Sequence, residues 1–235
     1  MKQKLFYFLM GLITLVMTSC NNKFKSVPLT ATLATFTAED ALGNPNLIGV
    51  KDLLTEEVII KPDTYASITA DENLITCIKV ENGYKQIQVY KHDGTELGLF
   101  DTFNHLISPG DYYLGTNYNV SCYYFPKTHE AVRGRAWYTG IKYLFLETDS
   151  GWKVFTFNGE LGLLLPENAK VVHNLTSEGK EKFYLVMEER SNVVLLDIDD
   201  MKTTKVYTLQ EWIKTISQKE VREFSHLTII KTENI

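Results

Sequence analysis

Cysteine is scarce in this chain, and no two cysteines have the spacing of a metal or redox motif. The 235 residues contain three cysteines, Cys20, Cys77 and Cys122, and no Cys-x-x-Cys pair. This argues against a cysteine zinc site and against a dithiol redox motif. In an oxidising compartment Cys77 and Cys122 are a candidate disulfide, and the alternative is two separate buried thiols in strands.

The sequence also lacks the motifs of common catalytic and cofactor sites. It contains no HExxH, GxSxG, Walker A or GxGxxG pattern. Its five histidines are scattered without metal-ligand spacing. The acidic run at 197–200 offers oxygen ligands to calcium, but it lacks the glycine and the distal glutamate of an EF-hand loop, which favours an acidic hairpin turn. We therefore expect no catalytic residues, no metal site and no cofactor.

The chain has no excess of positive charge. Its 24 Lys and Arg residues are outnumbered by 29 Asp and Glu residues, which gives a formal net charge of −5. Nucleic-acid binding rewards clustered Lys and Arg, so a nucleic-acid partner is not expected. Aromatic residues make up 12% of the chain, which is enough for a packed core and argues against disorder.

Long apolar runs are absent as well. The N-terminal run Leu5–Met17 is shorter than the ~20 residues that a membrane-spanning helix needs. It follows Lys2 and Lys4 and ends at the small residues Thr18 and Ser19, the arrangement of a secretory signal. The alternatives are a buried N-terminal helix and a plain signal that is cleaved elsewhere.

With Cys20 directly after Ser19, this segment resembles a bacterial lipoprotein signal. The resemblance implies that 1–19 is removed and that Cys20 carries the lipid as the mature N-terminus. Several acyl chains together anchor a protein stably, unlike a single myristoyl group. The expected location is the cell envelope, anchored to the outer membrane. No acidic cluster follows Cys20, which favours the periplasmic face.

Residues 20–46 are polar and rich in turn residues, which predicts a tether between the anchor and a folded domain at 47–235. In that domain, short runs rich in Val, Ile, Tyr and Phe alternate with Gly, Asn and Asp. Such runs predict strands, and the turns at 81–83, 92–94, 149–151 and 158–159 predict hairpins. The expected fold class is mostly β, with antiparallel hairpin repeats in a propeller-like, barrel-like or open arrangement.

Two segments of the domain echo each other. Gly-Tyr-Lys at 83–85 leads to Glu-Leu-Gly at 96–98, and Gly-Trp-Lys at 151–153 leads to Glu-Leu-Gly at 160–162. A third strand–turn–strand unit at 183–200 keeps the layout without the glycines. Repetition of this kind predicts stacked or radially arranged hairpin units.

These units resemble degenerate WG-type β-repeats, which contain a Gly-aromatic-Lys strand start and an acidic-Gly turn. The stretches Gly49–Asp52 and Glu57–Pro62, followed by Tyr65, are similar to the same family. The resemblance covers about half of the chain, and region 99–140 departs from it because it shows no regular repeat. WG-type repeats imply a β architecture and an interaction role, without a defined activity.

The end of the domain has a different pattern. Thr208 followed by Glu211 forms a capping box, which predicts a helix over 209–218. Trp212, Ile213 and Ile216 are expected on the face that packs against the sheet. Residues 227–231 predict a final strand.

The most unusual composition lies in 112–143, which combines many aromatic residues with five basic side chains and a single carboxylate. Aromatic faces stack on sugar rings, and arginine pairs with carboxylates or phosphates. One interpretation is a binding face that includes Tyr124, Arg133, Arg135 and Trp137. The alternative is that strand alternation buries the aromatic rings and leaves the cations as a solvated face.

These observations predict a lipid-anchored, non-enzymatic binding module whose partner is an envelope protein or a glycan. The alternative is a carbohydrate-active protein that binds glycans or hydrolyses glycosides, which requires two carboxyl groups held several ångströms apart. A third interpretation is a purely structural envelope component.

Overall fold

The computed structural model describes residues 26–107, 110–118 and 120–233. The signal segment and the lipidation residue Cys20 lie outside this part of the chain. The chain divides into two compact units, with the boundary between Leu99 and Phe100.

Among the described residues, no helix combines the length and the apolar character needed to cross a membrane.

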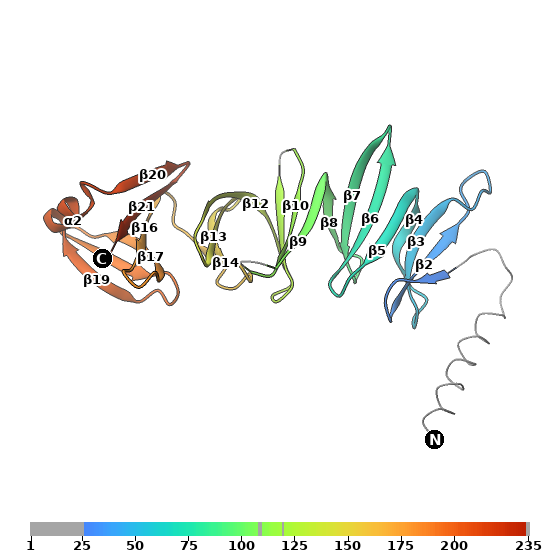
Figure 1. Ribbon diagram of the computed structural model, residues 1–235, viewed down its shortest axis with the longest axis horizontal. Helices are drawn as coiled ribbons and strands as arrows, with labels where there is room; N and C mark the ends of the chain where they lie inside the picture. Colours follow the sequence, from blue (N-terminus) through green and yellow to red (C-terminus); the bar gives the residue numbers. More distant parts are fainter. Residues whose placement is uncertain (1–25, 108–109, 119, 234–235) are drawn as a thin grey trace, which may run out of the picture. The chain divides into compact units, whose positions relative to one another are not determined.

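The first unit contains two antiparallel sheets of four strands each (Figure 1). Their orders are β1-β2-β3-β4 and β5-β6-β7-β8. The strands are β1 (Ser26–Pro28), β2 (Leu33–Ala38), β3 (Leu47–Asp52), β4 (Val58–Asp63), β5 (Tyr65–Ala70), β6 (Leu74–Glu81), β7 (Tyr84–Lys91) and β8 (Glu96–Phe100). Residues of both sheets share one buried apolar cluster, to which Leu33, Val50 and Ile75 belong.

The tether predicted over 20–46 is wrong for the part that forms β1 and β2. Strand β2 pairs along its whole length with β3. Its residues Leu33 and Ala34 are buried, with exposed fractions of 3% and 0%. The short apolar stretch around Leu33 therefore belongs to the core of the first unit, although polar and turn residues surround it in the sequence.

The second unit contains a seven-stranded antiparallel sheet in the order β15-β14-β13-β12-β11-β10-β9 (Figure 1). Each strand pairs with its neighbour in the sequence. The strands are β9 (Thr102–Leu106), β10 (Tyr112–Thr116), β11 (Ser121–Phe125), β12 (Glu130–Thr139), β13 (Tyr143–Thr148), β14 (Gly151–Thr156) and β15 (Leu163–Leu164).

A six-stranded sheet in the order β19-β18-β17-β16-β21-β20 completes the second unit. Its last strand, β21 (Leu227–Glu233), runs parallel to β16 (Ala169–Leu175), whereas all other pairs are antiparallel. The remaining strands are β17 (Glu181–Glu188), β18 (Asn192–Asp197), β19 (Thr203–Thr208) and β20 (Glu220–Phe224). The parallel pair puts the C-terminal strand β21 next to β16.

The predicted fold class is confirmed: the described chain is mostly antiparallel β structure with one short helix. None of the four sheets closes on itself, so the barrel-like alternative is not observed. The two echoing segments take the same form, because 83–98 forms β7, a turn and β8, and 151–164 forms β14, a turn and β15. Their aromatic residues differ, since Tyr84 is exposed and Trp152 is buried.

The predicted helix is confirmed as α2 (Leu209–Ile216), and both halves of its Thr208–Glu211 capping box are formed. Trp212 is buried, and Ile216 packs against the same cluster. The prediction for Ile213 is wrong, because 55% of this residue is exposed. A helix of eight residues that covers only the edge of a sheet buries a narrow stripe, which excludes Ile213.

Gly159 gives a test of how tightly the second unit is packed. This residue has a φ of +80°, and a Cβ atom there would lie 2.3 Å from Cβ of the buried Phe125. Gly179 has a similar φ of +73° and open space around it. We expect Gly179→Ala to lower the free energy of unfolding by about 1 kcal/mol through backbone strain. Gly159→Ala adds overpacking of about 1–3 kcal/mol.

Urea unfolding of both variants, followed by tryptophan fluorescence, measures this difference. Equal losses in the two variants would contradict the packing of Gly159 against Phe125.

Candidate functional site

The two sheets of the second unit meet at a joint with an apolar core and a polar rim. Tyr143, Phe145 and Val154 of the seven-stranded sheet pack against Val171 and Phe183 of the six-stranded sheet in one buried cluster. At the rim, the indole Nε1–H of Trp152 donates a hydrogen bond to the carbonyl oxygen of Ser225 at 2.5 Å. The joint therefore fixes the positions of the side chains at its edges.

Three polar side chains, Tyr138, His173 and Glu181, lie in contact with one another at one end of this joint. The hydroxyl of Tyr138 lies 2.5 Å from Nδ1 of His173, and Nε2 of His173 lies 2.8 Å from Oε1 of Glu181. The imidazole ring also stacks on Phe183, with the ring centroids 4.4 Å apart. Strands β12, β16 and β17 each contribute one member, so these contacts link the two sheets.

Of these three side chains, Glu181 is the most buried. Its side chain is 4% exposed, and Oε2 accepts the backbone N–H groups of Ile141 at 2.7 Å and Lys142 at 3.1 Å. Burial by itself raises the pKa of a carboxyl group, but the contact with His173 and the two N–H groups outweigh it. The pKa of Glu181 therefore lies below its ordinary value of 4.5.

Glu181 faces one of the two ring nitrogens of His173. A carboxylate only accepts hydrogen bonds, so it favours the tautomer of His173 that carries its proton on Nε2. Nδ1 then accepts the hydroxyl proton of Tyr138. Burial raises the pKa of Tyr138 to about 12, which keeps this hydroxyl protonated at neutral pH.

Gly140 allows the close approach of the 139–142 turn to Glu181. A Cβ atom at Gly140 would lie 2.5 Å from both carboxylate oxygens of Glu181. A side chain there would push the turn away and break the N–H contacts.

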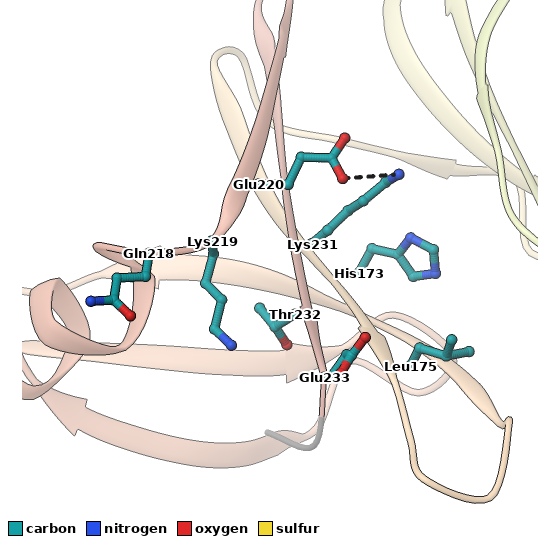
Figure 2. Close-up of a pocket in the computed structure, with 8 residues that line it drawn as sticks. All are labelled: His173, Leu175, Gln218, Lys219, Glu220, Lys231, Thr232 and Glu233. Atoms are coloured by element: carbon teal, nitrogen blue, oxygen red, sulfur yellow. Dashed lines mark ion pairs between the residues drawn. The ribbon is translucent and has the colours of Figure 1, made fainter.

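Two hollows open at this end of the joint and share His173, Leu175 and Lys231. The larger hollow has a volume of about 500 Å³ and reaches Tyr138, Glu181 and Arg222; its other lining residues are Thr139, Gly140 and Ile141. The smaller hollow has a volume of about 380 Å³, and its other lining residues are Gln218, Lys219, Glu220, Thr232 and Glu233 (Figure 2). Strands β20 and β21 contribute to both.

Glu220 contacts two of the three Lys and Arg side chains that line the hollows. Nε of Arg222 donates to Oε1 of Glu220 at 2.7 Å. Nζ of Lys231 lies 3.5 Å from Oε2 of the same carboxylate, the ion pair marked in Figure 2. Lys231 also lies 6.0 Å from the ring centroid of Tyr138. Arg222 therefore lines the larger hollow and Lys231 lines both, and each has further N–H groups that can donate hydrogen bonds.

The residues predicted for the binding face are not gathered on one surface. Arg133 and Arg135 are exposed on β12, but Tyr124 is only 2% exposed. Its hydroxyl lies 3.2 Å from Nδ1 of His129, and its ring packs against Tyr113. The proposed stacking role of Tyr124 is therefore wrong. Trp137 belongs to β12, and its side chain lies outside the described part of the structure.

Burial on both faces of the sheet explains the position of Tyr124. Neighbouring residues of a strand point to opposite faces. Tyr123 and Tyr124 are nevertheless both buried, with exposed fractions of 5% and 2%, and the same holds for Tyr112 and Tyr113, with 7% and 3%. Among the described aromatic side chains of 112–143, all are core residues apart from Tyr118, which is 97% exposed.

Cys77 and Cys122 are free thiols in the structure, and both are buried. Each lies in a different unit of the chain. Burial raises the pKa of the Cys77 thiol to about 12 and also raises that of Cys122. Both are therefore protonated at neutral pH, and the candidate disulfide is not formed in the structure.

The acidic run at 197–200 forms the end of β18 and a turn. Its three carboxylates pair with three different lysines: Asp197 with Lys182, Asp199 with Lys142 and Asp200 with Lys202. Within the described ranges, no group of three or more His, Cys, Asp or Glu side chains is placed to hold a metal ion.

The sequence did not predict the contact of Tyr138, His173 and Glu181. The three residues are widely separated in the sequence and follow no motif. The one local signal is His173 itself, a titratable residue inside the strand Ala169–Leu175 whose neighbours Val171 and Val172 are fully buried.

No protein-family model matches this chain, and no curated protein matches it. Among solved structures, apo AztD from Citrobacter koseri is 12% identical with a TM-score of 0.23, and the match covers 80% of this chain and 60% of that one. A second AztD structure from Citrobacter koseri is 12% identical with a TM-score of 0.26 and coverages of 90% and 63%.

The dihydro-heme d1 dehydrogenase NirN, in complex with DHE, is 12% identical with a TM-score of 0.21 and coverages of 80% and 46%. The chain thus spans less than two thirds of each of these structures. At such TM-scores the likeness carries no argument about fold or function.

Glu181→Gln tests the contribution of the buried carboxylate. We expect a loss of about 2 kcal/mol in the free energy of unfolding at pH 7, because the charge-assisted contacts weaken in a buried site. The exposed Glu223→Gln on β20 is the matched control, with a change below about 0.5 kcal/mol. Urea unfolding at pH 7 measures both, and similar losses would contradict the assigned role.

The lowered pKa of Glu181 also predicts a pH dependence. A carboxyl group whose pKa is lower in the folded state stabilises the fold above its unfolded value of 4.5. This stabilisation is lost as the pH falls below 4.5 through the folded pKa. The difference in stability between the wild type and Glu181→Gln is therefore expected to shrink between pH 5 and pH 3. A stability difference that stayed constant over that range would show that it does not come from the ionisation of Glu181.

Proposed function

We propose that this protein is a lipid-anchored binding module of the cell envelope, which holds a small polar ligand in the two hollows at the joint. The observation that carries the proposal is the pair of adjoining hollows itself, whose linings combine the cations Lys219, Arg222 and Lys231 with the carboxylates Glu181, Glu220 and Glu233. A concave site with a few convergent polar groups is the usual form of a small-molecule site.

Binding is favoured over catalysis because the reactive groups at the joint are already engaged. Nδ1 of His173 is hydrogen-bonded to the hydroxyl of Tyr138, and Nε2 is buried 2.8 Å from Oε1 of Glu181. Both oxygens of Glu181 have partners too, in His173 and the two backbone N–H groups. A general base must have a free lone pair near the substrate. These groups instead serve to keep the shape of the site.

Glycan binding is the second candidate, and the same contacts favour it over glycoside hydrolysis. Hydrolysis needs one carboxyl group as acid and a second as nucleophile or base. Glu181 lines the larger hollow, but its oxygens are occupied and its low pKa opposes the role of a proton donor. The mixed donors and acceptors of the lining suit the hydroxyl groups of a sugar.

The anchor is tested separately from the site. We expect Cys20→Ser to move the protein from the membrane fraction to the soluble fraction of a bacterial host, because the thiol is the acceptor of the lipid. Metabolic labelling with a fatty acid and cell fractionation measure the change, with Cys77→Ser as control. Labelling of Cys20→Ser at the wild-type level would refute the anchor and leave the site untouched.

Leu175→Trp tests the hollows. Leu175 lines both of them and is 40% exposed, so a larger side chain fills the space without entering the core. We expect native mass spectrometry of the wild type, after incubation with the soluble small molecules of an envelope extract, to show bound species that Leu175→Trp lacks.

The control is Met187→Trp, a similarly exposed position on β17 outside these two hollows. Identical bound species in the wild type and both variants would contradict a site at the joint.

A further inference from the structure

We propose that the ligand of the larger hollow is an acidic sugar, a saccharide whose carboxylate binds to Arg222 and Lys231. This inference rests on the proposed function and adds the chemical class of the ligand.

Arg222 supplies the first half of the carboxylate site. Its guanidinium group donates to Glu220 through Nε, and within the described chain its two terminal amino groups make no hydrogen bond. The side chain is 49% exposed and lines the larger hollow. Paired N–H groups of a guanidinium match the two oxygens of a carboxylate. Arg222 can therefore bind a carboxylate while it keeps its contact with Glu220.

Lys231 supplies the second half. Its ammonium group has three protons to donate. In the described structure its one ion-pair partner is Glu220, at the long distance of 3.5 Å. Its side chain is 30% exposed and lines both hollows. A carboxylate in the larger hollow would gain a charge-assisted contact from Lys231 at little cost to the existing pair.

The larger hollow presents its cations more openly than its carboxylate, since Arg222 and Lys231 are 49% and 30% exposed and Glu181 is 4% exposed. Arg222 and Lys231 are the two permanent cations of its lining, and Glu181 is its one carboxylate. Glu181 is 4% exposed and already accepts two backbone N–H groups, so its charge is compensated from within the fold. The two cations thus face the hollow with only Glu220 beside them.

The size and polarity of the site favour a sugar over a simple ion. The larger hollow measures about 500 Å³, far more than one phosphate or carboxylate group fills. Beyond the two cations, Thr139 offers a hydroxyl, and the adjoining hollow offers the amide of Gln218. Leu175 gives an apolar surface for the C–H face of a ring. A ring acid with several hydroxyl groups uses all of these features.

The experiment is titration calorimetry of the full chain with three probes: glucuronate, glucose and inorganic phosphate. We expect glucuronate to bind at least tenfold more tightly than glucose or phosphate. Arg222→Gln is expected to weaken glucuronate binding at least tenfold, and Lys231→Met to weaken it as well. Arg222→Lys keeps the positive charge but lacks the paired N–H groups of the guanidinium, so an intermediate affinity for glucuronate is expected.

Arg190→Gln is the matched control, because it removes the same charge from an exposed position outside the hollows. It is expected to bind glucuronate like the wild type. Circular dichroism and the urea midpoint of each variant confirm folding, which an exposed edge-strand residue such as Arg222 should not affect.

Absence of glucuronate binding, equal binding of phosphate, or equal binding by Arg222→Gln would overturn the acidic-sugar assignment. The proposed function would still stand if Leu175→Trp lost the species bound from the envelope extract. If that variant kept them as well, both the function and the ligand class would fail.

Discussion

The buried contact of Tyr138, His173 and Glu181 is the interaction on which the candidate site depends. It links strands of two sheets that otherwise meet only through apolar side chains and a few polar contacts at the rim. Apolar packing holds the sheets together but is non-directional, whereas hydrogen bonds require defined distances and angles. The Tyr138–His173 hydrogen bond and the backbone N–H groups that Glu181 accepts therefore fix the part of the larger hollow that these residues line.

Burial on both faces is the second constraint on the seven-stranded sheet. An antiparallel sheet with one solvated face shows alternating apolar and polar residues, but a sheet covered on both faces does not. Strand Ser121–Phe125 accordingly has four buried residues in succession. This explains why region 99–140 shows no repeat pattern, and why its aromatic residues resemble an exposed binding face in the sequence although most of them are core.

Local signals predicted the local structure well. The Thr208–Glu211 capping box marks the start of α2, and the Asn-Gly and Asp-Gly turns separate paired strands, because both signals depend on residues only a few positions apart. Predictions of whether a residue is buried or exposed were less accurate, because burial depends on residues that are distant in the sequence. Residues 26–38 are polar enough for a tether, yet Leu33 is buried. Tyr124 has the composition of a ligand-stacking residue, yet its ring lies inside.

The amino-acid sequence by itself determined the β class of the fold, its hairpins and its one capped helix, since these follow from short-range backbone preferences. It also supplied the expectation of a lipid anchor at Cys20. Only the tertiary structure decided which polar residues meet. Tyr138, His173 and Glu181 come from three strands, and the parallel pairing of β21 with β16 brings Lys231 next to His173. Such contacts depend on how the sheets pack, which no local spacing encodes.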